Sequence, residues 1–386
     1  MVRTPALRRT AAYYLLFACL GLDAGLLGPT LPALAGQTRA SLGQMGLLFL
    51  LAATGGVLGT AASGRLFDRL RGHVVLGTAQ LCAAALMASM PLVPQFWMLA
   101  AVAGCKGVAQ SIVNAGTNTL LIWTHRDKPG PYMNALHFVF GLGAFLTPLL
   151  VAQLAGSAGG YRLAYWVLAG LVATNGLRMV SLPDSPRPTL AAGRRGAGAG
   201  PAPCAFVLSA ALFFFFYGGA EITFRGWAYT YAITVGLADA AGAAYLNSAF
   251  WVALTVGRLA SIPAAMRFKP QHVIPVAVAS CLAFLGLALL FPRSSAALWT
   301  ASVGLGFFIG PVWATGFTLA GQSVDLSGRL SSLILLGNSL GGMLLPAALG
   351  RIIETAGPRS MIAMIFGSLI LNMLAFAAML KLRPRR

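Results

Sequence analysis

Four charged residues, Asp23, Lys106, Glu221 and Arg225, lie inside long apolar stretches of the sequence. A charged side chain in a hydrocarbon core costs about 2.5–3.5 kcal/mol. Four of them therefore cost about 10 kcal/mol, which is comparable with the whole stability of a typical protein. We expect each to meet a partner, water or a solute, and a carboxylate in such a place can take up a proton or a cation. Static ion pairs that orient two helices are the alternative interpretation.

One predicted helix, residues 96–122, carries a stripe of long polar side chains. Lys106, Gln110, Asn114 and Asn118 recur at every fourth residue, which places them along one face of the helix. Lipid cannot hydrate such a face, so we expect it to line an aqueous cavity and to bind a solute. The alternative is that these groups only hold neighbouring helices together.

Glu221 is the first candidate for an ion-coupling carboxylate, and Asp23 is the second. Burial disfavours the charged form of a carboxylate, so Glu221 can exchange a proton. Arg225 follows it by one turn on the same face and favours the anion. Asp23, with oxygens from neighbouring Asn or Thr side chains, can instead hold Na⁺.

Aromatic residues in the second half of the chain can stack on a sugar ring. We expect Trp227, Trp251 and Trp313 to supply this apolar face to a solute, with Arg225 beside them. Tyr229 and Tyr231 are better interpreted as part of an aromatic belt at the membrane surface.

The elements that carry these residues are predicted to be transmembrane helices. Hydrophobic residues make up 58% of the 386 residues and charged residues only 9%, which is too few to keep a soluble fold dissolved. The apolar runs are about 20 residues long, the length that crosses a ~30 Å hydrocarbon core. The fold class is therefore all-α integral membrane, with twelve spans. We predict them at residues 11–34, 43–63, 74–92, 96–122, 132–155, 161–181, 204–232, 243–264, 273–291, 296–319, 331–352 and 360–381.

The net charge of +19 sets the topology rather than indicating a nucleic-acid partner. Most of the 27 Lys and Arg residues fall on one side of the predicted spans, while a few lie on the other, namely Arg39, Arg162, Arg293, Arg351 and Arg359. We therefore expect both termini in the cytoplasm and a multi-pass protein of the plasma (inner) membrane. The first apolar run is too long for a signal peptide and is interpreted as a retained span. The five cysteines have no metal-ligand spacing, so neither a metal site nor a cofactor is expected.

A Pro-, Gly- and Arg-rich break at residues 183–203 divides the predicted spans six and six. It predicts an N-terminal six-helix bundle (residues 1–182), a cytoplasmic linker (183–203) and a C-terminal six-helix bundle (204–386). Gly64-Arg-Leu recurs as Gly257-Arg-Leu, and a Gly-x-x-x-x-Pro pattern at 143–148 recurs at 341–346. The similar offsets of these repeats indicate two pseudo-symmetric halves, an architecture found in transporters.

The motif Gly64-Arg-Leu-Phe-Asp68-Arg69 follows the second predicted span. It resembles the cytoplasmic Gly-x-x-x-Asp-Arg signature of the major facilitator superfamily, and the resemblance extends along the whole chain. Polar residues also concentrate in predicted spans 1, 4, 7 and 10, the spans that line the central cavity in that superfamily. We expect Asp68 to act as a cytoplasmic gating latch whose carboxylate suits a helix N-terminus, with Arg69 and Arg126 nearby.

Three stretches resemble the fucose–galactose–glucose symporter group and the related sodium-dependent glucose transporter branch. They are residues 136–148, 219–227 and 257–263. The first adds His137 to the candidate solute-binding residues. The sugar symporters pair an acid in span 1 with an acid in span 4; Asp23 matches the first, and Asn114 stands in place of the second.

These features together predict a secondary active transporter that works by alternating access. The expected activity is H⁺- or Na⁺-coupled uptake of a sugar or a similar polar solute. A transporter of an anionic or amphipathic organic solute, selected by Lys106 and Arg225, is the alternative, and a non-transporting scaffold or receptor is a further one. No nucleophile–base spacing indicates an enzyme. The expected partners are a small-molecule solute and the lipid bilayer, and the expected state is a monomer.

Overall fold

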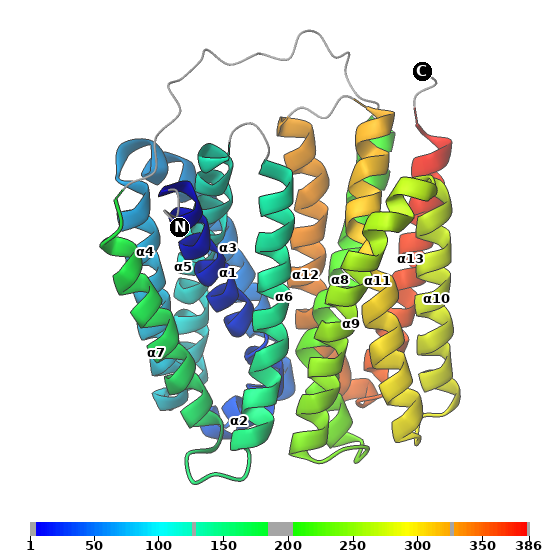
Figure 1. Cartoon of the computed structure of the whole chain (residues 1–386). Coiled ribbons are helices and arrows are strands. Elements are labelled where there is room, and N and C mark those ends of the chain that lie inside the picture. Colours follow the sequence, from blue (N-terminus) through cyan, green and yellow to red (C-terminus); the bar gives the residue numbers. More distant parts are fainter. Residues whose placement is uncertain (1–4, 126–128, 184–203, 325–327, 384–386) are drawn as a thin grey trace. The chain divides into compact units, whose positions relative to one another are not determined.

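The structure is a computed structural model that describes residues 5–125, 129–183, 204–324 and 328–383. The described residues form long helices and no strand (Figure 1). The helices are α1 (Pro5–Ala24), α2 (Leu27–Thr38), α3 (Leu42–Arg69), α4 (Gly72–Ser89) with the short 3₁₀ turn η1 (Met90–Leu92), α5 (Phe96–Thr124), α6 (Pro129–Leu154), α7 (Gly160–Val180), α8 (Cys204–Thr234), α9 (Ala240–Arg267), α10 (Pro270–Leu290), α11 (Ser295–Ser323), α12 (Gly328–Ala356) and α13 (Ser360–Lys381).

The predicted membrane spans agree with these helices. Within the described residues, 11 helices are long and apolar enough to cross a membrane, or up to 12 if α1 and α2 count as one bent span. The first predicted span is not one straight helix, because α1 and α2 meet at an angle of 49°. The apolar run in the sequence continues through the bend, so hydropathy alone does not reveal it.

The chain divides into two compact units, which are described separately. Unit 1 contains α1–α7 and residues 240–248 of α9, and unit 2 contains α8, the rest of α9, and α10–α13. In this division the start of α9 belongs to unit 1. The division expected from the sequence, into bundles of residues 1–182 and 204–386, stays a prediction. The predicted linker lies outside the described residues from residue 184 onward.

In unit 1 the closest helix pairs are α3 with α5, α4 with α7 and α1 with α6. Glycines allow the backbones to touch: a Cβ at Gly143 of α6 would overlap the carbonyl oxygen of Ala18 in α1. The end of α5 is tied to α1, because the His125 Nε2 lies 2.6 Å from the Thr10 Oγ1. The His125 ring also stacks on Tyr132 of α6, with ring centroids 3.5 Å apart. These contacts fix α1, α5 and α6 relative to one another.

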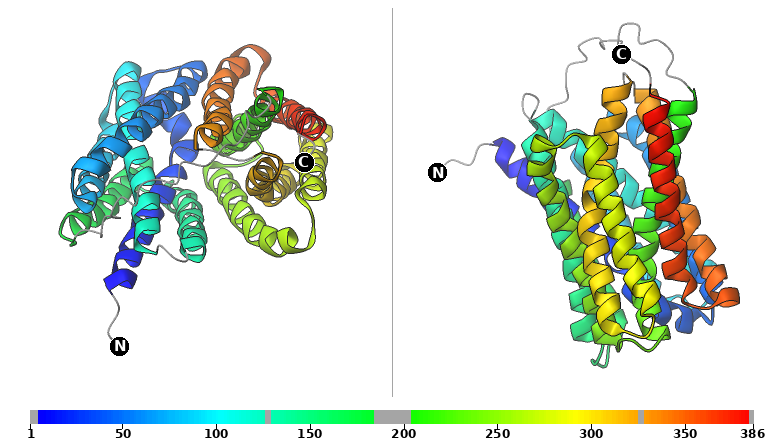
Figure 2. Two further views of the ribbon diagram at one scale, coloured as in Figure 1. Left: turned by 90° about the horizontal axis from the view of Figure 1, so that it is seen from above. Right: turned by 90° about the vertical axis from the view of Figure 1, so that its right-hand side faces the viewer.

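In unit 2 helix α8 packs against both α12 and α13 (Figure 2). Two glycines of α12 permit this, since a Cβ at Gly337 or Gly341 would overlap a carbonyl oxygen of α8. The side chain of Asn372 in α13 donates to the carbonyl of Phe213 in α8 at 2.7 Å. Helix α8 is therefore held on two sides, and its polar residues have fixed positions.

Candidate functional site

The first membrane span is interrupted at residues 25 and 26, between α1 and α2, and Asp23 lies in the last turn of α1. Pro29 has no amide hydrogen, and its ring crowds the carbonyl four residues earlier, so a continuous helix is disfavoured there. The amide of Leu26 bonds to the carbonyl of Asp23 at 3.1 Å. In a regular helix it would bond to Leu22. The break therefore leaves the carbonyl of Leu22 without its helical donor.

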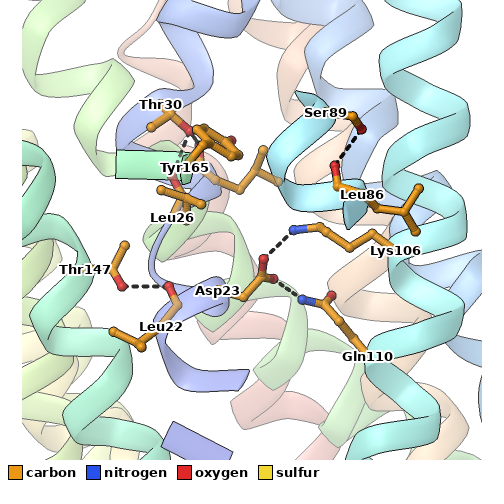
Figure 3. Close-up of polar contacts among 11 residues, drawn as sticks. Leu22, Asp23, Leu26, Thr30, Leu86, Ser89, Lys106, Gln110, Thr147 and Tyr165 are labelled. Atoms are coloured by element: carbon orange, nitrogen blue, oxygen red, sulfur yellow. Dashed lines mark hydrogen bonds and ion pairs between the residues drawn. The ribbon is translucent and has the colours of Figure 1, made fainter. Parts of the chain in front are cut away.

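Neighbouring helices hold the break from both sides. The Thr147 hydroxyl of α6 is wholly buried and donates to the free carbonyl of Leu22 at 2.6 Å (Figure 3). Beyond the break, the hydroxyls of Thr30 in α2 and Tyr165 in α7 lie 3.0 Å apart. A backbone polar group left unpaired inside a membrane would cost several kcal/mol. The carbonyl that the bend frees is thus hydrogen-bonded, so the bend is stable and fixes the position of Asp23.

The Asp23 carboxylate is held by the polar face of α5. The Lys106 Nζ is 2.6 Å from Asp23 Oδ1, and the Gln110 amide donates to Oδ2 (Figure 3). Both charged residues are 8% exposed. A buried ion pair needs such additional hydrogen bonds, because mutual attraction alone rarely offsets the loss of hydration. The structure thus joins three of the predicted site residues into one network.

The next two residues of the stripe contact each other. The Asn118 side-chain amide donates to the backbone carbonyl of Asn114 at 2.8 Å and to its side-chain oxygen at 2.9 Å. Asn114 is exposed and Asn118 is half-buried. Helix α5 therefore carries a neutralised ion pair at Lys106 and, two to three turns further along the same face, accessible amides that can hydrogen-bond a solute.

Unit 2 contains a second buried carboxylate, Glu221 of α8. It accepts a hydrogen bond from the hydroxyl of Tyr217, one turn earlier, and its Oε2 lies 3.7 Å from Nη2 of Arg258 in α9. The guanidinium carbon of Arg225 lies 5.2 Å from the centre of the Trp251 ring, in cation–π geometry. Helices α8 and α9 thus place a carboxylate and two guanidinium groups within unit 2.

The three predicted tryptophans have different surroundings. Trp227 is wholly buried, and its indole nitrogen donates to the carbonyl of Pro346 in α12 at 3.1 Å. Trp251 is 1% exposed. Trp313 of α11 is half-buried and stacks on Phe317, with ring centroids 5.7 Å apart and planes at 11°. Of these three indoles, only Trp313 presents an accessible surface in this structure.

The remaining predicted residues lie apart from these clusters. His137 of α6 is exposed and meets the ring of Phe17 edge-on, with centroids 5.4 Å apart. Asp68 and Arg69 are exposed in the last turn of α3. Arg126 lies outside the described residues.

Three residues near Glu221 were not among the predicted site residues. Tyr217 precedes Glu221 by one helical turn, so its contact could have been anticipated from the spacing. In the sequence Arg258 is noticeable only as part of the repeated Gly-Arg-Leu motif, and nothing there links it to Glu221. Asn338 of α12 lies against Gly218, and its buried side-chain oxygen has no hydrogen-bond donor among the described residues.

The arrangement supports two kinds of chemistry. Amides on α5 can exchange hydrogen bonds with a polar solute, since each amide both donates and accepts. A carboxylate that is paired with an ammonium or guanidinium group can exchange that partner for another cation. Within the described residues, no group of three or more His, Cys, Asp or Glu side chains could hold a metal ion.

The chain is similar to several known proteins. The mouse (Mus musculus) sodium-dependent glucose transporter 1A is 29% identical over an alignment of 407 positions, which covers 96% of this chain and 95% of the mouse protein. The sodium-dependent glucose transporter 1 of Xenopus laevis is 27% identical, covering 84% of this chain and 72% of that protein.

Solved transporter structures share the fold. A bacterial homologue of the human lysosomal transporter Spinster, in an inward-facing and occupied conformation, superposes with a TM-score of 0.76 at 14% identity, over 100% of both chains. The nucleoside transporter NupG superposes with a TM-score of 0.75 at 15% identity, over 97% of this chain and 99% of NupG. The sequence profile of the Major Facilitator Superfamily matches residues 13–346. With its long helices and its buried polar network, this chain belongs to the Major Facilitator Superfamily of transporters.

Proposed function

We propose that this transporter couples the uptake of a sugar or a similar polar solute to the movement of a cation. The observation that carries the proposal is the Asp23–Lys106 ion pair, buried at a break in a membrane span and continued by amides along α5. The names of two similar proteins, both called sodium-dependent glucose transporters, support the same substrate and ion.

Gln110, Asn114 and Asn118 bind the solute in this proposal. Amide groups match the alternating donors and acceptors of sugar hydroxyls. A hydrogen-bonding group of the solute that loses its partner costs about 1–3 kcal/mol, or roughly 5- to 150-fold in affinity. We expect that weakening for Asn114→Ala and for Asn118→Ala in equilibrium binding of labelled solute. Asn175→Ala in α7 is the matched control, and unchanged affinity in both test variants would place the site elsewhere.

Sodium binds at Asp23 in this proposal, in exchange for the Lys106 ammonium group. Two cations compete for one carboxylate, so Na⁺ binding releases Lys106 and changes the face of α5 that contacts the solute. Uptake into proteoliposomes should then follow a Na⁺ gradient at fixed pH, and Asp23→Asn should remove that dependence. Uptake by this variant that still follows the Na⁺ gradient would refute the assignment.

Proton coupling at Glu221 is the competing scheme. Protonation would weaken the attraction of Glu221 to Arg258 and Arg225 and so alter the packing of α8 against α9. In that case Glu221→Gln abolishes uphill transport but still exchanges labelled solute, while Glu354→Gln at the exposed end of α12 behaves as wild type. If the Asp23 and Glu221 variants both concentrate solute normally, these acids are structural.

An anionic solute is disfavoured by the same geometry. It would have to compete with Asp23 for Lys106 and to approach Arg225 where this side chain covers Trp251. A thermal-shift screen of sugars against organic anions on purified protein separates the two classes. A shift with anions alone would favour the alternative.

Both termini face the cytoplasm in this proposal, and Asp68 acts as a cytoplasmic latch. The excess of basic residues at one set of helix ends supports this orientation. Fusions of a cytoplasmic and a periplasmic reporter to each terminus test the orientation. We expect Asp68→Asn to slow turnover while sparing solute binding, and unchanged turnover would count against the latch.

A further inference from the structure

An apolar groove with a volume of about 500 Å³ runs along α3, α4 and α5 within unit 1. This volume is in the range of small-molecule sites in proteins. Its walls are almost entirely hydrocarbon, and the polar exceptions are Thr78, Cys82 and Cys105. All three of these residues are exposed, so the groove is open to the surroundings of unit 1.

The groove is long rather than compact. Val74, Thr78, Cys82 and Leu86 line it from one face of α4 at intervals of four residues. At 1.5 Å per residue this face extends for about 18 Å along the helix axis. A sugar in such a place would leave its hydroxyls without hydrogen-bond partners, which is unfavourable. A linear hydrocarbon chain fits both the shape and the chemistry.

One end of the groove is basic. Arg71 is the residue directly before α4 and precedes the lining residue Val74 by three positions, and Arg69 follows Leu66, a lining residue of α3, by about one turn. Both arginines are exposed, as is the nearby Asp68, so the two cations outnumber the acid. At the other end, residues 87–95 contain no charged side chain. The groove is therefore apolar along its length and positively charged at one mouth.

We propose that this groove binds an acyl chain of an anionic phospholipid, whose phosphate is held by Arg69 and Arg71. The three helices span the membrane, so lipid is the ligand present at the highest concentration around them. The mouth lies at the connection between the end of α3 and the start of α4, where a membrane span meets the depth of the lipid head groups. Arginine suits phosphate because its planar fork can donate two hydrogen bonds at once.

The cysteines of the chain provide the test. Cys82 and Cys105 line the groove, Cys204 is exposed at the start of α8, and Cys19 and Cys281 are buried. The wild-type protein is placed in nanodiscs of phosphatidylcholine with increasing phosphatidylglycerol and treated with an apolar maleimide. Peptide mass spectrometry then gives the labelling rate of each cysteine. We expect phosphatidylglycerol to slow labelling of the two groove cysteines while the rate at Cys204 stays constant.

Substitutions of the two arginines at the basic end of the groove test whether they contact the lipid head group. Each basic residue near an anionic surface contributes about 1 kcal/mol, or about fivefold in affinity. Arg69→Gln with Arg71→Gln should raise the phosphatidylglycerol fraction needed for half-protection roughly 25-fold, and Arg→Lys at both positions should largely restore it. Arg71 makes no side-chain cap to α4, so its replacement does not remove a helix cap. Arg267→Gln, at the end of α9 in unit 2, is the control.

Two results would overturn the proposal. Equal protection by phosphatidylcholine and phosphatidylglycerol would mean that the groove takes any lipid, with no head-group recognition. Protection by phosphatidylglycerol that survives the double Arg→Gln replacement would place the head group elsewhere.

Discussion

A double-mutant cycle on Asp23 and Lys106 measures the ion pair at the break in the first span. The single variants are Asp23→Asn and Lys106→Met, and the third is their combination. At an effective dielectric constant of about 20, two unit charges 2.6 Å apart attract each other by about 6 kcal/mol. Desolvation offsets roughly half of this, so each single variant, which leaves one buried charge unpaired, should lose about 3 kcal/mol in free energy of unfolding.

The double variant leaves neither charge behind. We expect it to lose no more than about 3 kcal/mol, which gives a coupling energy of at least about 3 kcal/mol between the two positions. Unfolding by sodium dodecyl sulfate in mixed micelles, followed by circular dichroism, provides the free energies without any assumption about the solute. Lys381→Met at the exposed end of α13 should change stability by less than about 0.5 kcal/mol. Losses at Asp23 and Lys106 that simply add would refute the reasoning.

Three further changes test the fold around the site. Thr147→Val removes the donor to Leu22 and should cost about 1–3 kcal/mol in unfolding free energy, and a neutral result would mean that another group satisfies this carbonyl. Gly341→Ala should lower the melting temperature because its Cβ would overlap a backbone oxygen of α8, whereas Gly367→Ala, which meets open space, should stabilise by up to about 1 kcal/mol. Burial lowers the pKa of His125 below its usual 6.5, so the unfolded chain binds a proton first as the pH falls, and stability should drop below about pH 6.5. In His125→Gln the melting temperature should depend less on pH across this window, and an equal dependence would exclude His125 as the cause.

The helices could be predicted closely from the sequence, whereas the partners of the buried charges could not. Hydropathy locates each span without reference to the others. The four-residue spacing of Lys106 and Gln110 correctly places these two residues on one face of α5. Which helix that face meets depends on packing, and the contact with Asp23 joins residues 83 positions apart along the chain. The same limit applies to Glu221, for which the sequence suggests the local Arg225 and the fold adds Arg258 from α9.

Proline was the signal that would have located the break after Asp23. Pro29 and Pro32 both lie in the predicted first span, but prolines are tolerated in membrane helices when neighbours satisfy the freed carbonyls. Only the structure identifies Thr147 as that neighbour. Trp227 has a partner that the sequence does not indicate either, because its indole nitrogen joins α8 to α12, and its expected contact with a solute stays a prediction.

Because of the bend in the first span, a small rotation of α2 about this point would move its far end by a larger distance. Its 12 residues extend for about 18 Å from Leu27 to Thr38, so a rotation of about 10° at the bend would move the far end by about 3 Å. Near that far end Gln37 donates to the carbonyl of Met90 at 2.9 Å and accepts from the hydroxyl of Tyr161. If Na⁺ replaces Lys106 at Asp23, as proposed, we expect the change to reach these hydrogen bonds at the opposite end of α2. Replacing Gln37 would cut this connection without touching the carboxylate.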